Sequence, residues 1–288
     1  MKHEKKAMNC IEIIKKIINT INLTGNKIQL NKNNCSQIYS KKHFVIKTEL
    51  LSFENSIVSG NSNEIVIKMF NDKILNHLDC WNNEIDQYLR LKSFFGNKYL
   101  PNLIFSCPGI AIYEFIPGEN YFDLLMAHKL SNNSISLLAE CFFKVNEQGL
   151  VFGDARLRNF IFSKSQNLFL VDFEEIHEGD VIRDISNFMV SFIDNYPGIF
   201  EGSDIGYNLN RMIYFLNSYQ LLKNGSNSHI IPNHENIEDL ADFWIKQIGN
   251  SLKIVIERRS LQINNTKMEK IKKKIKNAFL QYASSPKY

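Results

Sequence analysis

Hydrophobic and polar residues follow two different repeats along this chain of 288 residues. Between residues 27 and 116, apolar residues form short runs rich in Val, Ile and Phe that are separated by turn residues, a pattern typical of β-strands. Beyond Pro117-Gly118 they recur mainly every three or four positions, which is typical of helices. The pattern therefore predicts an α+β protein with a β-rich first lobe and a mainly helical second lobe.

Each lobe can be divided into elements from the same pattern. An amphipathic helix is expected at 8–23, packed on the first lobe, and a hairpin turn at 59–63. The remaining elements expected in the first lobe are strands at 27–30, 38–39, 44–53, 65–70, 103–105 and 109–115, and a helix at 80–95. Those expected in the second lobe are helices at 121–128, 134–148, 181–195, 207–223, 236–257 and 266–282, and short strands at 150–152, 160–162 and 168–171. The resulting division is an N-terminal helix in 1–26, a first lobe in 27–116 and a second lobe in 117–288.

Charge is distributed unevenly. The net charge is +4, but residues 253–288 contain ten Lys or Arg against two Glu and so carry +8, which leaves −4 for the rest. A basic tail of this kind forms a solvated helical face, or attracts phosphates, nucleic acid or an anionic membrane surface.

The cysteines and the N-terminus bear on the compartment. The five cysteines are scattered without metal-binding spacing, which favours buried free thiols in a reducing cytoplasm. Lys15 and Lys16 interrupt the apolar part of the N-terminus, so a signal peptide is not expected, and no run is long enough to span a bilayer. We expect a cytoplasmic protein, at most peripheral at a membrane.

The segment 149–174 carries the most informative motif. An apolar strand leads to Gly153-Asp154, Asn159 follows five residues later, and a second apolar run ends at Asp172-Phe173-Glu174. This arrangement resembles the catalytic loop and the metal-binding motif of the protein-kinase-like superfamily. The resemblance implies a bilobal protein-kinase-like fold that binds ATP and Mg²⁺. Asp154 would then be the catalytic carboxylate at the attacking hydroxyl, and Asn159 and Asp172 would hold the metal.

Further residues match this family in the order that it requires. Lys68 ends the β-branched run 64–68 and resembles the lysine that contacts the nucleotide phosphates, and Glu84 resembles the helix glutamate that pairs with it, with Asp86 as a competitor on the same helix. The remaining matches are the hinge residues Glu114, Phe115 and Ile116, whose main chain would bond adenine, Ser36 near the phosphates, and Asp184, which would steady the catalytic loop.

The chain also departs from the family pattern. Residues 31–36 stand where a glycine-rich loop is expected, Phe152-Gly153 precede the catalytic aspartate in place of the usual His or Arg, and Glu174 replaces a glycine. Only eleven residues separate Asp172 from Asp184, too few for a peptide-binding activation segment, which favours the atypical branches with small acceptors.

The resemblance therefore predicts a phosphotransferase that moves the γ-phosphate of ATP to a hydroxyl of a small molecule or sugar. The aminoglycoside, choline and lipopolysaccharide-core sugar kinases are the branches it resembles. Glu174, Glu175, Glu178 and Asp180 would line the pocket of a cationic acceptor, or form a solvated acidic loop. The alternatives are an atypical Ser/Thr protein kinase, a pseudokinase serving as a nucleotide-binding scaffold, and a nucleic-acid-binding partner that uses the basic tail.

Overall fold

The protein is α+β, with antiparallel sheets and helices. The computed structural model describes residues 10–38, 40, 42–53, 63–194, 205–224, 237–258, 260–261 and 263–284. The chain forms two compact units. The first unit comprises Met1–Pro117 together with Asp172–Glu174, and the second comprises Gly118–Val171 and Glu175–Tyr288.

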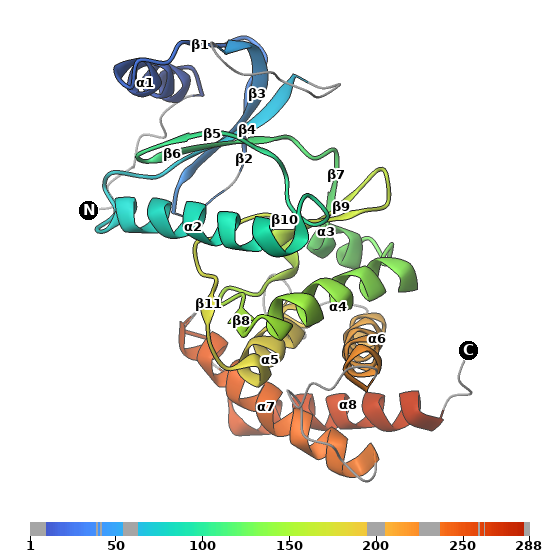
Figure 1. Cartoon of the computed structure of the whole chain (residues 1–288). Helices are drawn as coiled ribbons and strands as arrows, with labels where there is room; N and C mark the ends of the chain where they lie inside the picture. Colours follow the sequence, from blue (N-terminus) through green and yellow to red (C-terminus); the bar gives the residue numbers. More distant parts are fainter. Residues whose placement is uncertain are drawn as a thin grey trace. The chain divides into compact units, whose positions relative to one another are not determined.

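An antiparallel sheet forms the centre of the first unit (Figure 1). Its strands follow the order β1-β3-β4-β6-β5, and β2 pairs with β3 beyond the end of β1. The bounds are β1 Ile28–Leu30, β2 Ser36–Ile38, β3 Phe44–Phe53, β4 Glu64–Met69, β5 Leu103–Cys107 and β6 Ile110–Glu114. These strands match the expected ones to within a few residues, whereas the expected hairpin turn at 59–63 lies almost entirely outside the described residues.

The two faces of this sheet are different. Helix α1, Cys10–Leu23, contributes Ile13, Ile14, Ile17 and Ile21 to a buried cluster with alternate residues of the strands, such as Ile65 and Ile67 of β4. Because successive side chains of a strand point to opposite faces, Lys68 lies on the face away from α1. Helix α2, His77–Phe95, buries Glu84, Tyr88 and Leu91.

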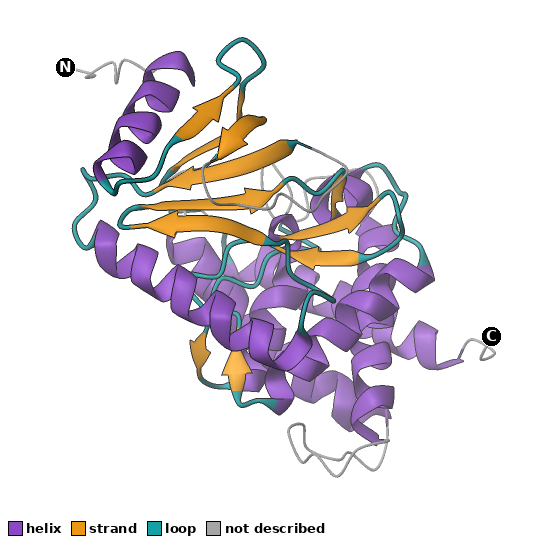
Figure 2. Ribbon diagram, turned by 45° about the horizontal axis from the view of Figure 1, so that its top comes forward, coloured by secondary structure: helices purple, strands orange, loops and turns teal. Residues whose placement is uncertain are grey.

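The second unit is mainly helical (Figure 2). Its helices are α3 Tyr121–Met126, α4 Asn132–Glu147, α5 Val181–Ser191, α6 Ile205–Asn224, α7 Ile237–Arg258 and α8 Asn265–Ser284. Its short strands form two small sheets, one of β10 Leu168–Leu170, β9 Phe160–Ser163 and β7 Gly118–Asn120, and one of β11 His177–Glu178 and β8 Leu150–Val151. The expected helices are confirmed within a few residues, but α5 ends at Ser191 instead of 195.

Two strands of the second unit were not expected. Gly118, interpreted from the sequence as part of a break, begins β7, and a Cβ at this position would collide with the backbone of Phe162 and Ser163. The glycine thus permits a close strand pairing. The sequence did not predict this strand because a Pro-Gly pair is typical of a break between elements. Strand β11 has only two residues, too few for a periodic signal.

Aromatic rings fill the core of the second unit. Phe142 of α4 is fully buried, and its ring centroid lies 4.4 Å from that of Phe152, 4.3 Å from that of Phe188 and 5.3 Å from that of Phe215. Rings at these separations bury large apolar areas and favour tilted or edge-to-face arrangements. This cluster fixes Phe152, two residues before Asp154.

None of the helices in the described ranges combines the length and the apolar character needed to cross a bilayer. All five cysteines are free, but only Cys107 and Cys141 are buried, and the other three are half-buried. The expectation of buried thiols is therefore right for two of the five.

Candidate functional site

Lys68 is the centre of a charged cluster in the first unit. On β4 it lies opposite Val45 of β3 and Ala111 of β6, and its side chain is only 10% exposed. Its Nζ donates to Glu84 Oε2 of α2 at 3.0 Å and to Asp172 Oδ1 at 2.6 Å, and Glu174 Oε2 lies 3.6 Å away. The ammonium group is therefore surrounded by three carboxylates, one from α2 and two from the segment 172–174.

Glu84 is the most buried member of this cluster, with a side chain 1% exposed, whereas its competitor Asp86 is exposed on the same helix. Besides Lys68, the Glu84 carboxylate accepts a hydrogen bond from the Phe173 amide at 2.9 Å and one from the Tyr113 hydroxyl at 3.0 Å. Three donors on one buried carboxylate satisfy the group almost completely. The expected pairing of Lys68 with Glu84, and not with Asp86, is present.

Burial and neighbouring charges shift the pKa values of Lys68 and Glu84 in opposite directions. Burial alone would lower the pKa of Lys68, but the carboxylates of Glu84, Asp172 and Glu174 outweigh it and raise that pKa. Burial raises the pKa of the Glu84 carboxyl, and the Lys68 ammonium offsets part of the rise. Lys68 therefore remains charged at any physiological pH.

Asp172 adopts an unusual backbone conformation in this cluster. Its φ is 75°, a left-handed value that aspartate tolerates better than most residues, and its side chain is 41% exposed. Such conformations cost about 1–3 kcal/mol and are concentrated at functional sites. The following residue, Phe173, is buried with its ring centroid 5.5 Å from that of Tyr88 and 6.1 Å from that of Tyr113. Packing of Phe173 thus holds Asp172 in a conformation that leaves its carboxylate open to solvent.

The chemistry of the donor set identifies which carboxylate could hold a metal ion. Oxygen atoms of Glu84, Asp172 and Glu174 lie close enough to one another to share a cation. However, the Lys68 ammonium already lies within 3.6 Å of all three, so a metal shared by the trio would have to displace it. Asp172, the exposed member, is the one that fits a divalent ion while Lys68 stays in place.

The predicted catalytic loop lies in the second unit. Asp154 follows β8 and Asn159 ends the short 3₁₀ helix Leu157–Asn159. The Asn159 amide donates from Nδ2 to the Asp154 carbonyl oxygen at 3.0 Å, and the Val171 amide donates to the Asn159 carbonyl oxygen at 2.9 Å. These bonds tie the loop to the residue that immediately precedes Asp172.

An arginine that sequence reasoning missed lies beside the predicted catalytic carboxylate. Nη2 of Arg156 lies 2.8 Å from Oδ1 of Asp154, and both side chains are about one-third exposed, at 38% and 32%. Arg156 occurs two residues after Asp154 in the motif, but nothing in its spacing identified a role. The ion pair supplies a positive charge next to the group expected to meet the acceptor hydroxyl.

Asp184 holds the same loop from α5. Its carboxylate accepts the amides of Phe152 at 2.9 Å and Gly153 at 3.1 Å, and the residue is 3% exposed. Burial raises the pKa of Asp184 to about 6, although the two amides oppose the shift. Asp184 thus contacts the loop in the manner expected from the sequence, while the neighbouring Asp180 caps α5 through the amides of Ile182 and Arg183.

The backbone conformation before Asp154 explains why a glycine occupies position 153. Gly153 has a φ of 69°, and a Cβ there would collide with the carbonyl oxygen of Glu175. A His or Arg at this position, as in the resembled family, would not fit this backbone. The departure from the family pattern is therefore consistent with the local fold.

Residues 31–35 connect β1 to β2, which both pair with β3, so they do not form the turn of a hairpin. Ser36 is exposed on β2, and residues 31–35 interrupt the pairing of one sheet edge with β3. The Asn31 side chain accepts the amides of Asn33 and Asn34 at 3.1 and 3.2 Å and also bonds Glu49. Glu49 is four residues along β3 from Val45, the partner of Lys68, which is about 13 Å at the usual rise per residue. These contacts argue against a phosphate-binding role for 31–34.

The loop that joins β2 to β3 lies closer to the charged cluster. Of its described residues, Lys42 donates from Nζ to Glu174 Oε1 at 2.9 Å, and His43 Nε2 lies 2.8 Å from Glu174 Oε2. Sequence reasoning assigned neither residue. The only signal was Glu174 itself, a carboxylate in a glycine position that needs a partner if it is buried.

The predicted hinge residues lie at the end of β6. The Phe115 amide donates to the Glu64 carbonyl oxygen at 3.1 Å, and the Glu114 amide donates to the Asn102 carbonyl oxygen at 2.9 Å. Adenine recognition would therefore need a main-chain group other than these two amides, such as those of Ile116. The Lys47 ammonium lies 3.6 Å from the centre of the Phe115 ring.

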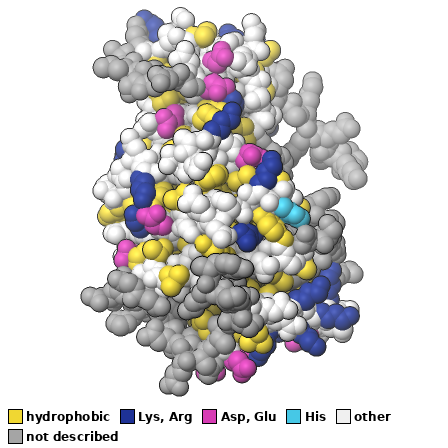
Figure 3. Space-filling model, turned by 90° about the vertical axis from the view of Figure 1, so that its right-hand side faces the viewer, with side chains coloured by type: hydrophobic (Ala, Val, Ile, Leu, Met, Phe, Trp, Pro, Cys, Tyr) yellow, Lys and Arg dark blue, Asp and Glu magenta, His cyan; other side chains and the backbone are white. Residues whose placement is uncertain are grey.

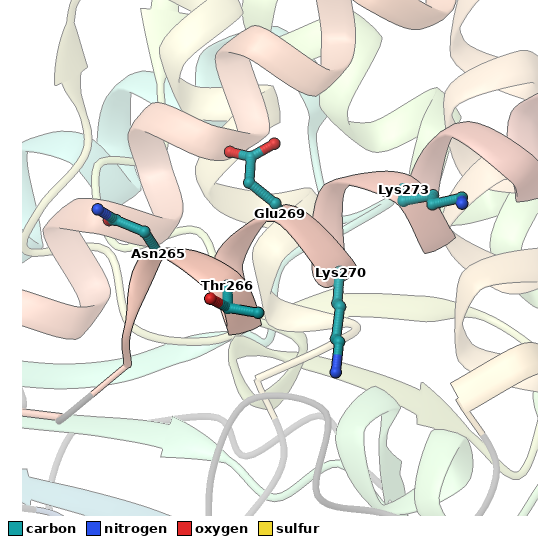
Figure 4. A pocket seen from close by; sticks show the side chains of 5 residues that line it. All are labelled: Asn265, Thr266, Glu269, Lys270 and Lys273. Carbon is teal, nitrogen blue, oxygen red and sulfur yellow. The ribbon is translucent and has the colours of Figure 1, made fainter.

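The basic tail forms much of α8. Lys272 and Lys276 pair with Glu269 and Asp242, whereas Lys270, Lys273 and Lys274 are exposed. A shallow groove on this helix is lined by Asn265, Thr266, Glu269, Lys270 and Lys273, with Glu269 and Lys270 extending to opposite sides (Figure 4). None of the predicted site residues lines it. On the face drawn in Figure 3, a few acidic and basic side chains are scattered among uncharged ones, and several basic side chains gather at the lower right.

The predicted site residues thus form two groups. Lys68, Glu84 and Asp172 are together in the first unit, and Asp154, Asn159 and Asp184 are together in the second. Whether both groups act on one ligand stays a prediction. The chain matches no protein-family model, and no curated protein is significantly similar to it.

Proposed function

We propose that this chain is an ATP- and Mg²⁺-dependent phosphotransferase of the bilobal protein-kinase-like type, with the first unit binding the nucleotide and the second providing the catalytic loop. The observation that carries the proposal is Lys68, whose Nζ contacts Glu84 at 3.0 Å and Asp172 at 2.6 Å. A lysine held by a helix carboxylate next to an exposed aspartate is the arrangement needed to contact nucleotide phosphates beside a metal ion.

Mg²⁺, when bound, would neutralise negative charge on the phosphates. Asp172 would hold it with its exposed carboxylate, and Asn159 would supply a second oxygen ligand. Lys68 would contact the phosphates, kept in orientation by Glu84. All of these are hard oxygen ligands or fixed positive charges, which suits phosphoryl transfer.

Asp154 would orient the acceptor hydroxyl and take its proton. The hydroxyl oxygen forms a bond to the γ-phosphorus, the bond from that phosphorus to the β–γ bridging oxygen breaks, and ADP leaves with this oxygen. Arg156, whose Nη2 lies 2.8 Å from Oδ1 of Asp154, would keep the carboxylate aligned. Asp184 fixes the loop through two main-chain amides and takes no part in the chemistry.

The acceptor proposed is a small molecule or sugar, since only eleven residues separate Asp172 from Asp184. A screen with γ-labelled ATP over pooled metabolites, sugars, RNA and proteins tests this, with Asp154→Asn as the matched inactive variant. Transfer to a small hydroxyl compound by the wild type alone supports the proposal. Labelling of a protein pool would indicate a protein kinase instead.

A pseudokinase is the second candidate, favoured by the absence of a glycine-rich segment between β1 and β3. It predicts ATP binding without turnover in every acceptor pool.

A nucleic-acid partner for α8 would be supported instead by a different result. The chain would bind RNA, the binding would weaken steeply with salt, and it would be lost when Lys270, Lys273 and Lys274 are replaced.

A further inference from the structure

Glu174 is a buried carboxylate whose contacts converge from three segments. Its side chain is 4% exposed and bonds Lys42 and His43 of the loop before β3. Its carbonyl oxygen accepts a hydrogen bond from the Asn83 side chain of α2. Its Oε2 also lies 3.6 Å from Nζ of Lys68 on β4. Glu174 is therefore linked to the loop before β3, to α2 and to Lys68 itself.

The hydrogen bonds of His43 define how it acts on Glu174. The Asn71 amide donates to Nδ1 of His43 at 3.4 Å, so Nδ1 is the acceptor of the ring. Nε2 then carries the hydrogen and donates to Glu174 Oε2 at 2.8 Å. His43 is 5% exposed and its ring centroid lies 4.5 Å from that of Phe70, which fixes the ring plane. The ring is thus an oriented donor to the carboxylate.

Three nitrogen atoms surround the buried Glu174 carboxylate. Lys42 Nζ lies 2.9 Å from Oε1, and His43 Nε2 and Lys68 Nζ lie 2.8 and 3.6 Å from Oε2. The Glu174 carboxylate therefore lies beside the Lys68 ammonium and is held there by contacts that do not involve Asp172.

We propose that Glu174, oriented by His43, is a positioning residue that holds Lys68 in place when Asp172 is engaged by metal. The inference rests on the proposed function. If Asp172 turns its carboxylate to Mg²⁺, Lys68 loses its shortest ion pair, at 2.6 Å. Glu84 and Glu174 then remain as two fixed carboxylates around the ammonium, so that it stays directed at the phosphates.

The proposal is tested by titrating Mg·ATP into variants and measuring the heat of binding. Glu174→Gln keeps the shape but removes the charge, and we expect affinity to fall about tenfold, equivalent to about 1.4 kcal/mol. His43→Leu removes the donor and should cause a similar loss, whereas His43→Gln retains an N–H donor and should stay within about threefold of the wild type. Asp86→Asn, on the exposed side of α2, is the matched control and should not change affinity.

A Lys68→Met background separates positioning from a general structural role. If Glu174 acts through Lys68, Glu174→Gln should change affinity less than about twofold in that background. An equal tenfold loss in both backgrounds would overturn the proposal, as would equal losses in His43→Leu and His43→Gln. Should Glu174→Gln fail to fold, Lys42→Met is the milder variant, because the Lys42 side chain is 51% exposed. Its Mg·ATP affinity should fall about two- to threefold in the otherwise wild-type protein and should not change in the Lys68→Met background.

A second measurement, made without ligand, distinguishes a failure of the proposed function from a failure of the role given to Glu174. Urea unfolding of the wild type, both single variants and the double variant gives the coupling between Lys68 and Glu174 in the free protein. Coupling without any Mg·ATP binding by the wild type would mean that the proposed function is wrong. Mg·ATP binding without coupling would mean that only the role of Glu174 is wrong.

Discussion

Replacement of Glu84 by Gln tests the most buried charge of the cluster. The carboxylate accepts from Lys68, Phe173 and Tyr113 at 2.9–3.0 Å and is 1% exposed. A Gln of the same shape has one acceptor oxygen, so at least one donor must lose its partner or meet an N–H group. The substitution also removes the charge opposite Lys68.

The size of this loss of stability depends on which carboxylates remain near Lys68. Breaking a buried ion pair costs about 3–5 kcal/mol when the partner charge is left alone. Lys68 would keep Asp172 at 2.6 Å and Glu174 at 3.6 Å, so the lower end applies, at about 3 kcal/mol. With a urea dependence of about 2 kcal/mol per molar, the unfolding midpoint should fall by about 1.5 M. Asp86→Asn, exposed on the same helix, should stay within about 0.5 kcal/mol.

The two tryptophans allow this to be measured for the first unit alone. Trp81 lies on α2, where Nε1 donates to the Ile110 carbonyl oxygen at 3.1 Å, and Trp244 is buried in α7 of the second unit. In a Trp244→Phe background, the fluorescence of Trp81 reports unfolding of the first unit. A Glu84→Gln midpoint indistinguishable from that of Asp86→Asn would refute the assigned network.

Two further predictions concern the second unit, for which Trp244 in a Trp81→Phe background is the reporter. The pKa of Asp184 is raised to about 6 from 3.8, so the folded state binds a proton more tightly than the unfolded chain. The contribution of Asp184 to the free energy of unfolding therefore falls by about 3 kcal/mol as pH rises from about 4 to 6. The stability of Asp184→Asn relative to wild type should therefore rise over that interval in urea titrations at each pH, and a difference that does not change with pH would contradict the assignment. Phe142→Ala should lower the unfolding free energy by about 4 kcal/mol through loss of ring contacts and the cavity left behind, and a loss below about 1 kcal/mol would mean that the core is not packed as described.

Sequence reasoning located the elements well because both repeats are strong here. The β-branched alternation of β4 and the helical spacing of the isoleucines in α1 each have a buried face to specify them. It failed where an element is set by a close backbone approach, as at Gly118 in β7, or is only two residues long, as in β11.

The candidate site was predicted in part for a related reason. Lys68, Glu84 and Asp172 carry recognisable spacing, and the structure brings them into contact. His43 and Lys42 have no spacing signal, because their contact with Glu174 spans more than 130 residues and depends on how the loop before β3 folds. Ser36 was chosen from its position in the sequence, which could not show that residues 31–35 connect two strands that pair with the same neighbour, β3.

The most direct test of the central claim is the Mg²⁺ dependence of ATP binding, measured by calorimetry with and without a chelator, for wild type, Asp172→Asn and Asp154→Asn. We predict that Mg²⁺ strengthens binding to the wild type at least tenfold, roughly 1.4 kcal/mol, that Asp172→Asn loses this increment, and that Asp154→Asn retains it because its carboxylate serves the acceptor. Binding by Asp172→Asn with the full Mg²⁺ increment, or a wild type that binds no ATP, would contradict the account.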